Sequence, residues 1–204
     1  MREDLIPQVE KAIEVLKKGG IVAFPTDTVY ALGAMANETS ALKKIFEVKE
    51  RPLSIALPLL IASESELDCA VASVPPAARK LTYAFWPGAL TLILKKSAWL
   101  PGIINNNGPD IAVRVPNHEI PVALIKGVGM PIIGTSANMH GHPNPTTAEG
   151  VREQLGNRVD FIVDGGRTPV GLESTIIDLT VNPAKMLREG AISRTEVEKI
   201  IPLT

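Results

Sequence analysis

The chain has 204 residues, of which 45% are hydrophobic, and this composition fits a folded globular protein and excludes a disordered one. Its 21 basic and 22 acidic residues give a net charge of −1, so the chain has no bulk attraction for nucleic acid or for an anionic membrane. The single cysteine, Cys69, excludes an internal disulfide and a cysteine-based zinc site.

Residues 1–4 carry charges of both signs, which is unlike a secretion signal. No apolar run approaches the roughly 20 residues that are needed to cross a bilayer. We therefore expect a soluble, cytoplasmic protein without a membrane contact.

The first predicted element is a helix on which Val9, Ile13 and Leu16 recur at helical spacing. The pair Gly19-Gly20 is typical of a left-handed helix end. The apolar run 21–24 then predicts a buried strand, and a polar turn rich in hydroxyl groups follows it.

A second helix is predicted after this turn, with Thr39 or Ser40 as its N-cap. Pro52 should end that helix, because a proline disfavours helical geometry in the preceding residue. Residues 55–61 predict a strand, and Pro58 within it favours a position at the sheet edge or a bulge.

The rest of the chain predicts short helices and strands in an irregular order. Thr147 is a candidate N-cap, and Ser193 with Glu196 forms a candidate capping box. Because the regular alternation of a doubly wound fold is missing, we expect an α/β protein of the α+β-like kind, with a twisted mixed sheet flanked by helices. The predicted helices are 64–71, 76–85, 118–126, 147–155 and 193–200, the strands are 89–94, 111–115, 131–134, 159–163, 175–179 and 186–187, and the long loops are 101–109 and 136–146.

Common catalytic signatures are absent. The sequence contains no Walker phosphate loop, no dinucleotide-binding glycine motif, no serine-hydrolase elbow and no zinc-protease motif. His140 and His142 lie in a proline-rich loop, where solvated residues are commoner than metal ligands. We therefore predict no metal-binding residues.

Four polar clusters stand at the ends of apolar runs, at residues 26–28, 49–51, 135–138 and 173–175. Each cluster alone is also explained by a turn, a helix cap or surface charge. Arg114 interrupts the apolar run 111–115, where it is either a surface charge on an edge strand or a buried group that needs an anionic partner.

The exact residue sequences around these clusters and their order along the chain are more informative than their composition. Together they resemble the YrdC-like family of threonylcarbamoyl-AMP synthases over about residues 10–195. The resemblance implies a YrdC-like fold with a central cavity and a single domain over residues 1–204. The motifs that carry it are Pro-Thr-Asp-Thr-Val-Tyr-Ala-Leu-Gly at 25–33, Lys-Glu-Arg-Pro at 49–52, Ala-Val-Arg-Val-Pro at 112–116, Thr-Ser-Ala-Asn at 135–138, Glu-Ser-Thr-Ile-Ile-Asp at 173–178 and Leu-Arg-Glu-Gly at 187–190.

The resemblance implies a nucleotidyltransferase that combines L-threonine, bicarbonate and ATP into threonylcarbamoyl-AMP and pyrophosphate. This is the first step in forming N6-threonylcarbamoyladenosine at adenosine 37 of tRNA (t6A37). A downstream threonylcarbamoyl-transferase complex is the implied partner, and Mg²⁺ is expected to accompany the nucleotide on its phosphate oxygens.

The same resemblance assigns the site residues. Lys49 and Arg51 match the catalytic Lys-x-Arg pair that neutralises the phosphates. Leu60 departs from the family pattern, because many relatives have a histidine there, and Ile55 replaces a residue that is often polar. The implied ATP contacts are Lys49, Arg51, Ile55, Asp110, Asn138, Thr146 and Arg188, and the implied threonine contacts are Thr28, Leu60, Arg114, Ser136 and Ser174.

Two other functions remain open at this stage. One is a module that binds double-stranded RNA or tRNA without turnover. The near-neutral charge gives little electrostatic attraction for RNA, and the two tryptophans, two tyrosines and four phenylalanines give little aromatic stacking. The other is a maturation enzyme that uses carbamoyl phosphate, although the chain lacks the zinc-finger cysteines of such proteins. The synthase is the favoured hypothesis.

Overall fold

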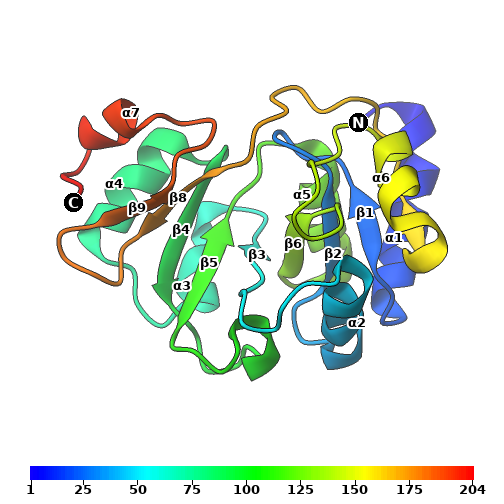
Figure 1. The fold of residues 1–204 in the computed structure, drawn as a ribbon, viewed down its shortest axis with the longest axis horizontal. Helices are drawn as coiled ribbons and strands as arrows, with labels where there is room; N and C mark the ends of the chain where they lie inside the picture. Colours follow the sequence, from blue (N-terminus) through cyan, green and yellow to red (C-terminus); the bar gives the residue numbers. More distant parts are fainter.

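The computed structural model describes residues 1–204, and its nine strands form one sheet in the order β7-β1-β2-β6-β3-β5-β4-β8-β9. The strands follow one another along the long axis of the molecule, with the N-terminus near α1 and α6 and the C-terminus at the opposite end (Figure 1). The strands are β1 (Val22–Phe24), β2 (Ala31–Met35), β3 (Leu59–Leu60), β4 (Leu90–Lys95), β5 (Asp110–Arg114), β6 (Ile132–Ser136), β7 (Phe161–Ile162), β8 (Thr175–Asp178) and β9 (Lys185–Arg188).

The sheet is mixed. Strand β1 pairs antiparallel with β2 and parallel with β7, β3 pairs antiparallel with β6 and parallel with β5, and β4 pairs antiparallel with β5 and parallel with β8. Helices flank this sheet, so the predicted fold class, a mixed sheet with helices around it, is confirmed.

Helix ends follow from local side chains. The Thr147 hydroxyl accepts a hydrogen bond from the Gly150 amide, and Ser193 with Glu196 forms a capping box, as predicted. The predicted N-cap of the second helix was wrong, because Glu38 occupies that position and its side chain accepts from the Ser40 amide. The helices are α1 (Ile6–Lys17), α2 (Thr39–Lys49), α3 (Leu67–Ala70), α4 (Pro76–Phe85), α5 (Glu119–Val128), α6 (Ala148–Leu155) and α7 (Arg194–Glu198), with short 3-10 helices at Glu3–Leu5, Glu64–Glu66, Gly102–Asn105 and Gly156–Arg158.

Apolar side chains form a separate core on each face of the sheet. The larger core joins the sheet to α2, α3, α4 and α6. The smaller core joins β1, β2 and β6 to α1 and α5. No helix of the structure combines the length and the apolar character of a membrane crossing.

Two strand predictions were wrong. Strand β2 was not predicted, because its sequence Ala-Leu-Gly-Ala-Met lacks the β-branched and aromatic residues that indicate strands. Only Leu59–Leu60 of the predicted strand 55–61 is extended, and it lies inside the sheet between β6 and β5 instead of at an edge. Pro58 comes just before it and does not interrupt pairing, since its carbonyl accepts from the Gly134 amide at 3.0 Å.

Candidate active site

A cavity of about 580 Å³ lies on the face of the sheet that also packs against α1 and α5. Its floor consists partly of small residues, with Ala31 on β2, Ala112 on β5 and Gly134 on β6. A Cβ atom at Gly134 would lie 2.2 Å from Cδ1 of Leu60, so a larger residue would displace that side chain. Gly134 thus leaves room for the Leu60 side chain at the cavity wall, and the small side chains of Ala31 and Ala112 project little into the cavity.

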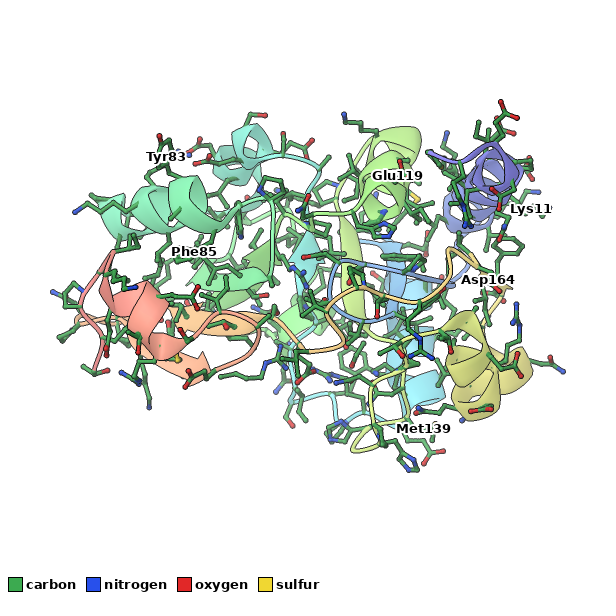
Figure 2. All side chains as sticks on the ribbon, turned by 90° about the horizontal axis from the view of Figure 1, so that it is seen from above. Lys11, Tyr83, Phe85, Glu119, Met139 and Asp164 are labelled. Atoms are coloured by element: carbon green, nitrogen blue, oxygen red, sulfur yellow. The ribbon has the colours of Figure 1, made fainter.

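Most of the predicted site residues meet in this cavity, although they come from positions 28 to 188. They lie on strands, at the end of α2, in the loops that follow β1, α2 and β6, and just before β8. Figure 2 labels Met139, which marks the loop after β6. The ten that line the cavity are Thr28, Lys49, Arg51, Ile55, Leu60, Arg114, Ser136, Asn138, Ser174 and Arg188.

The other two predicted residues do not line the cavity. Asp110 begins β5, and its carboxylate accepts a hydrogen bond from the Lys95 ammonium at 2.8 Å. The Thr146 hydroxyl accepts from Nη1 of Arg167 at 2.9 Å. Their side chains therefore form contacts outside the cavity, and their assignment as ATP contacts stays a prediction.

The hydroxyl-rich turn after β1 is held by Thr26. Its Oγ1 accepts from the Thr28 amide at 3.1 Å and donates to the Val29 carbonyl at 2.7 Å. The two threonine hydroxyls lie 2.9 Å apart. This local network fixes the Thr28 hydroxyl at the cavity wall, where it accepts from Nη1 of Arg114 at 2.9 Å.

Arg114 is buried, with 7% of its surface exposed, and β5 lies inside the sheet. It is therefore not the exposed charge of an edge strand. Its anionic partner is Asp27, whose Oδ1 lies 2.7 Å from Nη2, and its Nε donates to the Gly88 carbonyl at 2.9 Å. Burial lowers the pKa of Arg114, and Asp27 acts in the opposite direction. Asp27 stands within the Pro-Thr-Asp-Thr motif but was not among the predicted site residues.

Lys49 is buried, with 1% of its surface exposed, so its interpretation as a surface charge was wrong. Its Nζ donates to the carbonyls of Ser136 and Asn138 and, at 3.2 Å, to Oδ1 of Asn138. These three oxygens match the three hydrogens of an ammonium group. Burial, assisted by the charge of Arg51, lowers the pKa of Lys49 to about 7, while Glu173 opposes this shift. A bound anion would raise that pKa again.

Arg51 is half-buried and lies in the loop that follows α2. Its Nε donates to the Ile55 carbonyl at 3.1 Å and its Nη2 to the Ala56 carbonyl at 2.8 Å. Burial lowers the pKa of Arg51, whereas Glu173 raises it. The guanidinium thus fixes its own loop, including Ile55, at the rim of the cavity.

The Ser136–Asn138 segment orders the loop after β6. The Ser136 hydroxyl donates to Oδ1 of Asn138 at 2.6 Å, and Nδ2 of Asn138 donates to the His142 carbonyl at 2.6 Å. The His140 amide donates to the Lys49 carbonyl at 2.8 Å. His140 and His142 also line the cavity, which the sequence analysis did not predict because it treated them as solvated loop residues.

A second network joins β4, β8 and β9. The hydroxyls of Ser174 and Thr91 lie 2.8 Å apart, and Nη2 of Arg188 donates to Oγ of Ser174 at 3.3 Å. Nη1 of Arg188 lies 2.7 Å from Oε2 of Glu173. Thr91 and Glu173 therefore extend the predicted site, and Glu173 could have been found because it stands beside Ser174 in the quoted motif.

The charges of the cavity favour an anionic ligand. Its lining has four cationic side chains, of Lys49, Arg51, Arg114 and Arg188, against one carboxylate, that of Glu173. Arginine forks bind phosphate or carboxylate oxygens in pairs, and hydroxyls recognise polar groups beside them. The volume lies within the range of pockets for small organic ligands.

Comparisons with known proteins agree with this geometry. The Sua5/YciO/YrdC family profile, described as "Telomere recombination", matches residues 14–190. The threonylcarbamoyl-AMP synthase of Pyrococcus abyssi is 43% identical over 95% of this chain and 57% of its own length, and that of Bacillus subtilis is 43% identical over 96% of this chain and 57% of its own length. This chain therefore spans little more than half of these relatives.

Solved structures give the same picture. P. abyssi Sua5 complexed with L-threonine superposes with a TM-score of 0.92 at 42% identity, covering 96% of this chain and 58% of that one. Escherichia coli YciO superposes with a TM-score of 0.82 at 30% identity, covering 90% of this chain and 89% of that one.

Proposed function

Because this chain belongs to the Sua5/YciO/YrdC family, we propose that it synthesises threonylcarbamoyl-AMP from L-threonine, bicarbonate and ATP and releases pyrophosphate. The observation that carries the proposal is the convergence of ten predicted side chains in one cavity that is rich in both cations and hydroxyls. The reaction makes the protein a nucleotidyltransferase, and its product is the activated intermediate for t6A37 in tRNA. A downstream threonylcarbamoyl transferase would consume this product.

The chemistry needs positioning and charge more than a covalent intermediate. The threonine amine bonds to the carbon of bicarbonate, and an oxygen of the resulting carbamate attacks the α-phosphorus of ATP while pyrophosphate leaves. Holding the reactants together and neutralising the phosphates supply most of the catalysis in such transfers. The cationic lining of the cavity suits this task.

The proposed roles follow the local chemistry. Lys49 at the end of α2 and Arg51 in the loop that follows would hold the phosphates. Arg114 would hold the threonine carboxylate, with Thr28 beside it. The pairing of Arg114 with Asp27 supports this role, because it fixes the guanidinium in a single orientation. The remaining contacts proposed are Ile55, Asn138 and Arg188 for ATP, and Leu60, Ser136 and Ser174 for threonine.

Mg²⁺ fits the site only as a companion of the nucleotide. The single carboxylate of the lining, Glu173, is already paired with Arg188, and the structure has no group of three acidic, histidine or cysteine side chains that could hold a metal. Oxygens of the phosphates would therefore supply most of the magnesium ligands. Bound Mg²⁺ would neutralise phosphate charge.

The test is pyrophosphate release by the purified chain. We expect release only when threonine, bicarbonate and ATP are all present, together with threonylcarbamoyl-AMP detected by mass spectrometry. No release under these conditions, combined with salt-sensitive retention of duplex RNA, would favour the RNA-binding alternative instead. Release with carbamoyl phosphate replacing bicarbonate would favour the maturation enzyme.

A further inference from the structure

Glu173 is the one carboxylate among the side chains that line the cavity. Its Oε2 lies 2.7 Å from Nη1 of Arg188, and no protein group donates a hydrogen bond to its Oε1. Of the Glu173 side-chain surface, 35% is exposed. One carboxylate oxygen therefore remains available to a ligand in the cavity.

The proposed reaction requires such a group. An amino acid carries an ammonium group near neutral pH, and its nitrogen has no free electron pair until a proton is removed. We propose that Glu173 binds the ammonium of threonine and accepts that proton, an inference that rests on the proposed function.

The step balances as follows. The ammonium transfers one proton to the Glu173 carboxylate, which later releases it to solvent. The neutral amine then forms the C–N bond to the bicarbonate carbon, while one C–O bond breaks and its oxygen leaves as water with the second amine proton. The carbamate that remains carries the negative charge with which it attacks the α-phosphorus.

The position of Glu173 supports this role. It precedes Ser174, a proposed threonine contact, and Arg188 bonds to both side chains. Asp27, the carboxylate that pairs with Arg114, also accepts from the Asn117 amide, and it does not line the cavity.

The two histidines of the lining lie elsewhere. They belong to the loop whose His140 amide binds the Lys49 carbonyl, at the end that we propose for the phosphates. Glu173 adjoins Ser174 and also interacts with Lys49 and Arg51, so it lies between the proposed threonine contacts and the proposed phosphate contacts, where the carbamate forms. The charged groups that face it are Arg188, by direct contact, and Lys49 and Arg51, by their mutual electrostatic effects.

The test measures pyrophosphate release by wild type, Glu173→Gln and Glu173→Asp from pH 7 to pH 10. Glutamine keeps an acceptor for Arg188 but cannot take a proton. We expect the Gln variant to be slower by about 100-fold or more at pH 7, a typical contribution of a general base. The deficit should shrink as the pH rises, because hydroxide then deprotonates threonine without the enzyme.

Lys49 could also change the pH profile, but in the opposite direction. Glu173 raises the pKa of Lys49, so the Gln variant would lose the Lys49 charge at lower pH and its relative rate would fall as the pH rises. A deficit that is constant or that grows with pH would overturn the proposal and leave Glu173 as a positioning residue for Arg188. Equal rates for Gln variant and wild type would also overturn it.

Two control variants separate the loss of a general base from the loss of any carboxylate and from a folding defect. Glu149→Gln removes one carboxylate from the exposed surface of α6 and should retain the wild-type rate at every pH. Glu173→Asp should retain part of the activity, and it replaces the Gln variant if that variant does not fold. A wild-type chain without activity would reject the proposed function itself. An active wild-type chain with a pH-independent deficit in the Gln variant would instead reject only the role of Glu173 as a base.

Discussion

Lys49 and Arg51 stand two residues apart, yet the structure predicts stability losses of different size for their replacement. Lys49→Met and Arg51→Met keep the apolar stem of each side chain and remove its charge and its donors. We expect both variants to lose most of their pyrophosphate release, because both charges lie in the proposed phosphate site. Only Lys49→Met should also lose substantial stability.

The difference in magnitude follows from the hydrogen bonds. In Lys49→Met the carbonyls of Ser136 and Asn138 lose a buried donor, while Oδ1 of Asn138 keeps the Ser136 hydroxyl at 2.6 Å. Two buried acceptors without a partner cost about 1–3 kcal/mol each, and the relief of a buried charge offsets part of that cost. The free energy of unfolding should therefore fall by about 2–4 kcal/mol.

Arg51→Met is the matched control. Arg51 is half-buried and bonds to two carbonyls of its own loop, which water can reach once the guanidinium is gone. Its loss should cost about 1 kcal/mol. For a domain of this size 1 kcal/mol corresponds to about 2–4 °C in Tm, so we expect a decrease of roughly 5–15 °C for Lys49→Met and of about 2–4 °C for Arg51→Met.

Urea unfolding and thermal melting, followed by circular dichroism, measure both changes. A Lys49→Met variant within about 0.5 kcal/mol of wild type would refute the reasoning, because that spread is typical of surface substitutions. It would mean that Nζ does not hold the loop after β6. Full turnover by Arg51→Met would separately reject the phosphate role of Arg51.

Two further substitutions and one binding experiment have defined outcomes. Asp27→Asn should lower the free energy of unfolding by about 3–5 kcal/mol, since it leaves Arg114 buried without its counter-ion; unchanged urea unfolding would contradict this. Thr147→Ala should lower the free energy of unfolding by about 1 kcal/mol, because the Gly150 amide loses the hydroxyl that caps it, and pyrophosphate release should stay at the wild-type rate. Slower release would show that α6 affects the cavity. Binding of a nonhydrolysable ATP analogue near pH 8 should take up protons, because phosphate charge raises the pKa of Lys49 from about 7; calorimetry in two buffers of different ionisation enthalpy should detect this uptake in wild type and not in Lys49→Met.

Local sequence signals predicted several local interactions correctly, although they misplaced the N-cap of α2, which is Glu38. The Thr147 cap and the Ser193–Glu196 capping box involve residues three apart, so the sequence alone was sufficient. Strand β2 depends on its neighbours instead, because β1 and β6 pair with it on both sides and supply the hydrogen bonds that its own side chains do not favour.

The site shows the same division. The motifs predicted which residues gather in the cavity, but they did not predict how deeply each side chain is buried or which groups it contacts. Lys49 is buried because oxygens 87 and 89 residues away surround its ammonium group, and nothing near position 49 in the sequence reveals that contact. For Arg114 the sequence left two alternatives, an exposed charge on an edge strand or a buried group with an anionic partner. The fold decided between them and identified Asp27 as that partner.

The openness of the cavity also follows from the sheet. The smaller core shows that α1 and α5 cover the face of β1, β2 and β6, and the cavity occupies the same face from the edge of β2 and β6 across β3, β5, β4 and β8. Where no helix packs, the exposed face needs either polar side chains or a ligand, and this one carries threonines, serines and arginines fixed by hydrogen bonds. Because these bonds already orient the side chains, binding loses little conformational freedom, and the binding energy remains available to hold threonine and nucleotide together. The residues that appear structural, such as Asp27 and Thr91, therefore contribute to the proposed chemistry by holding Arg114 and Ser174 in place.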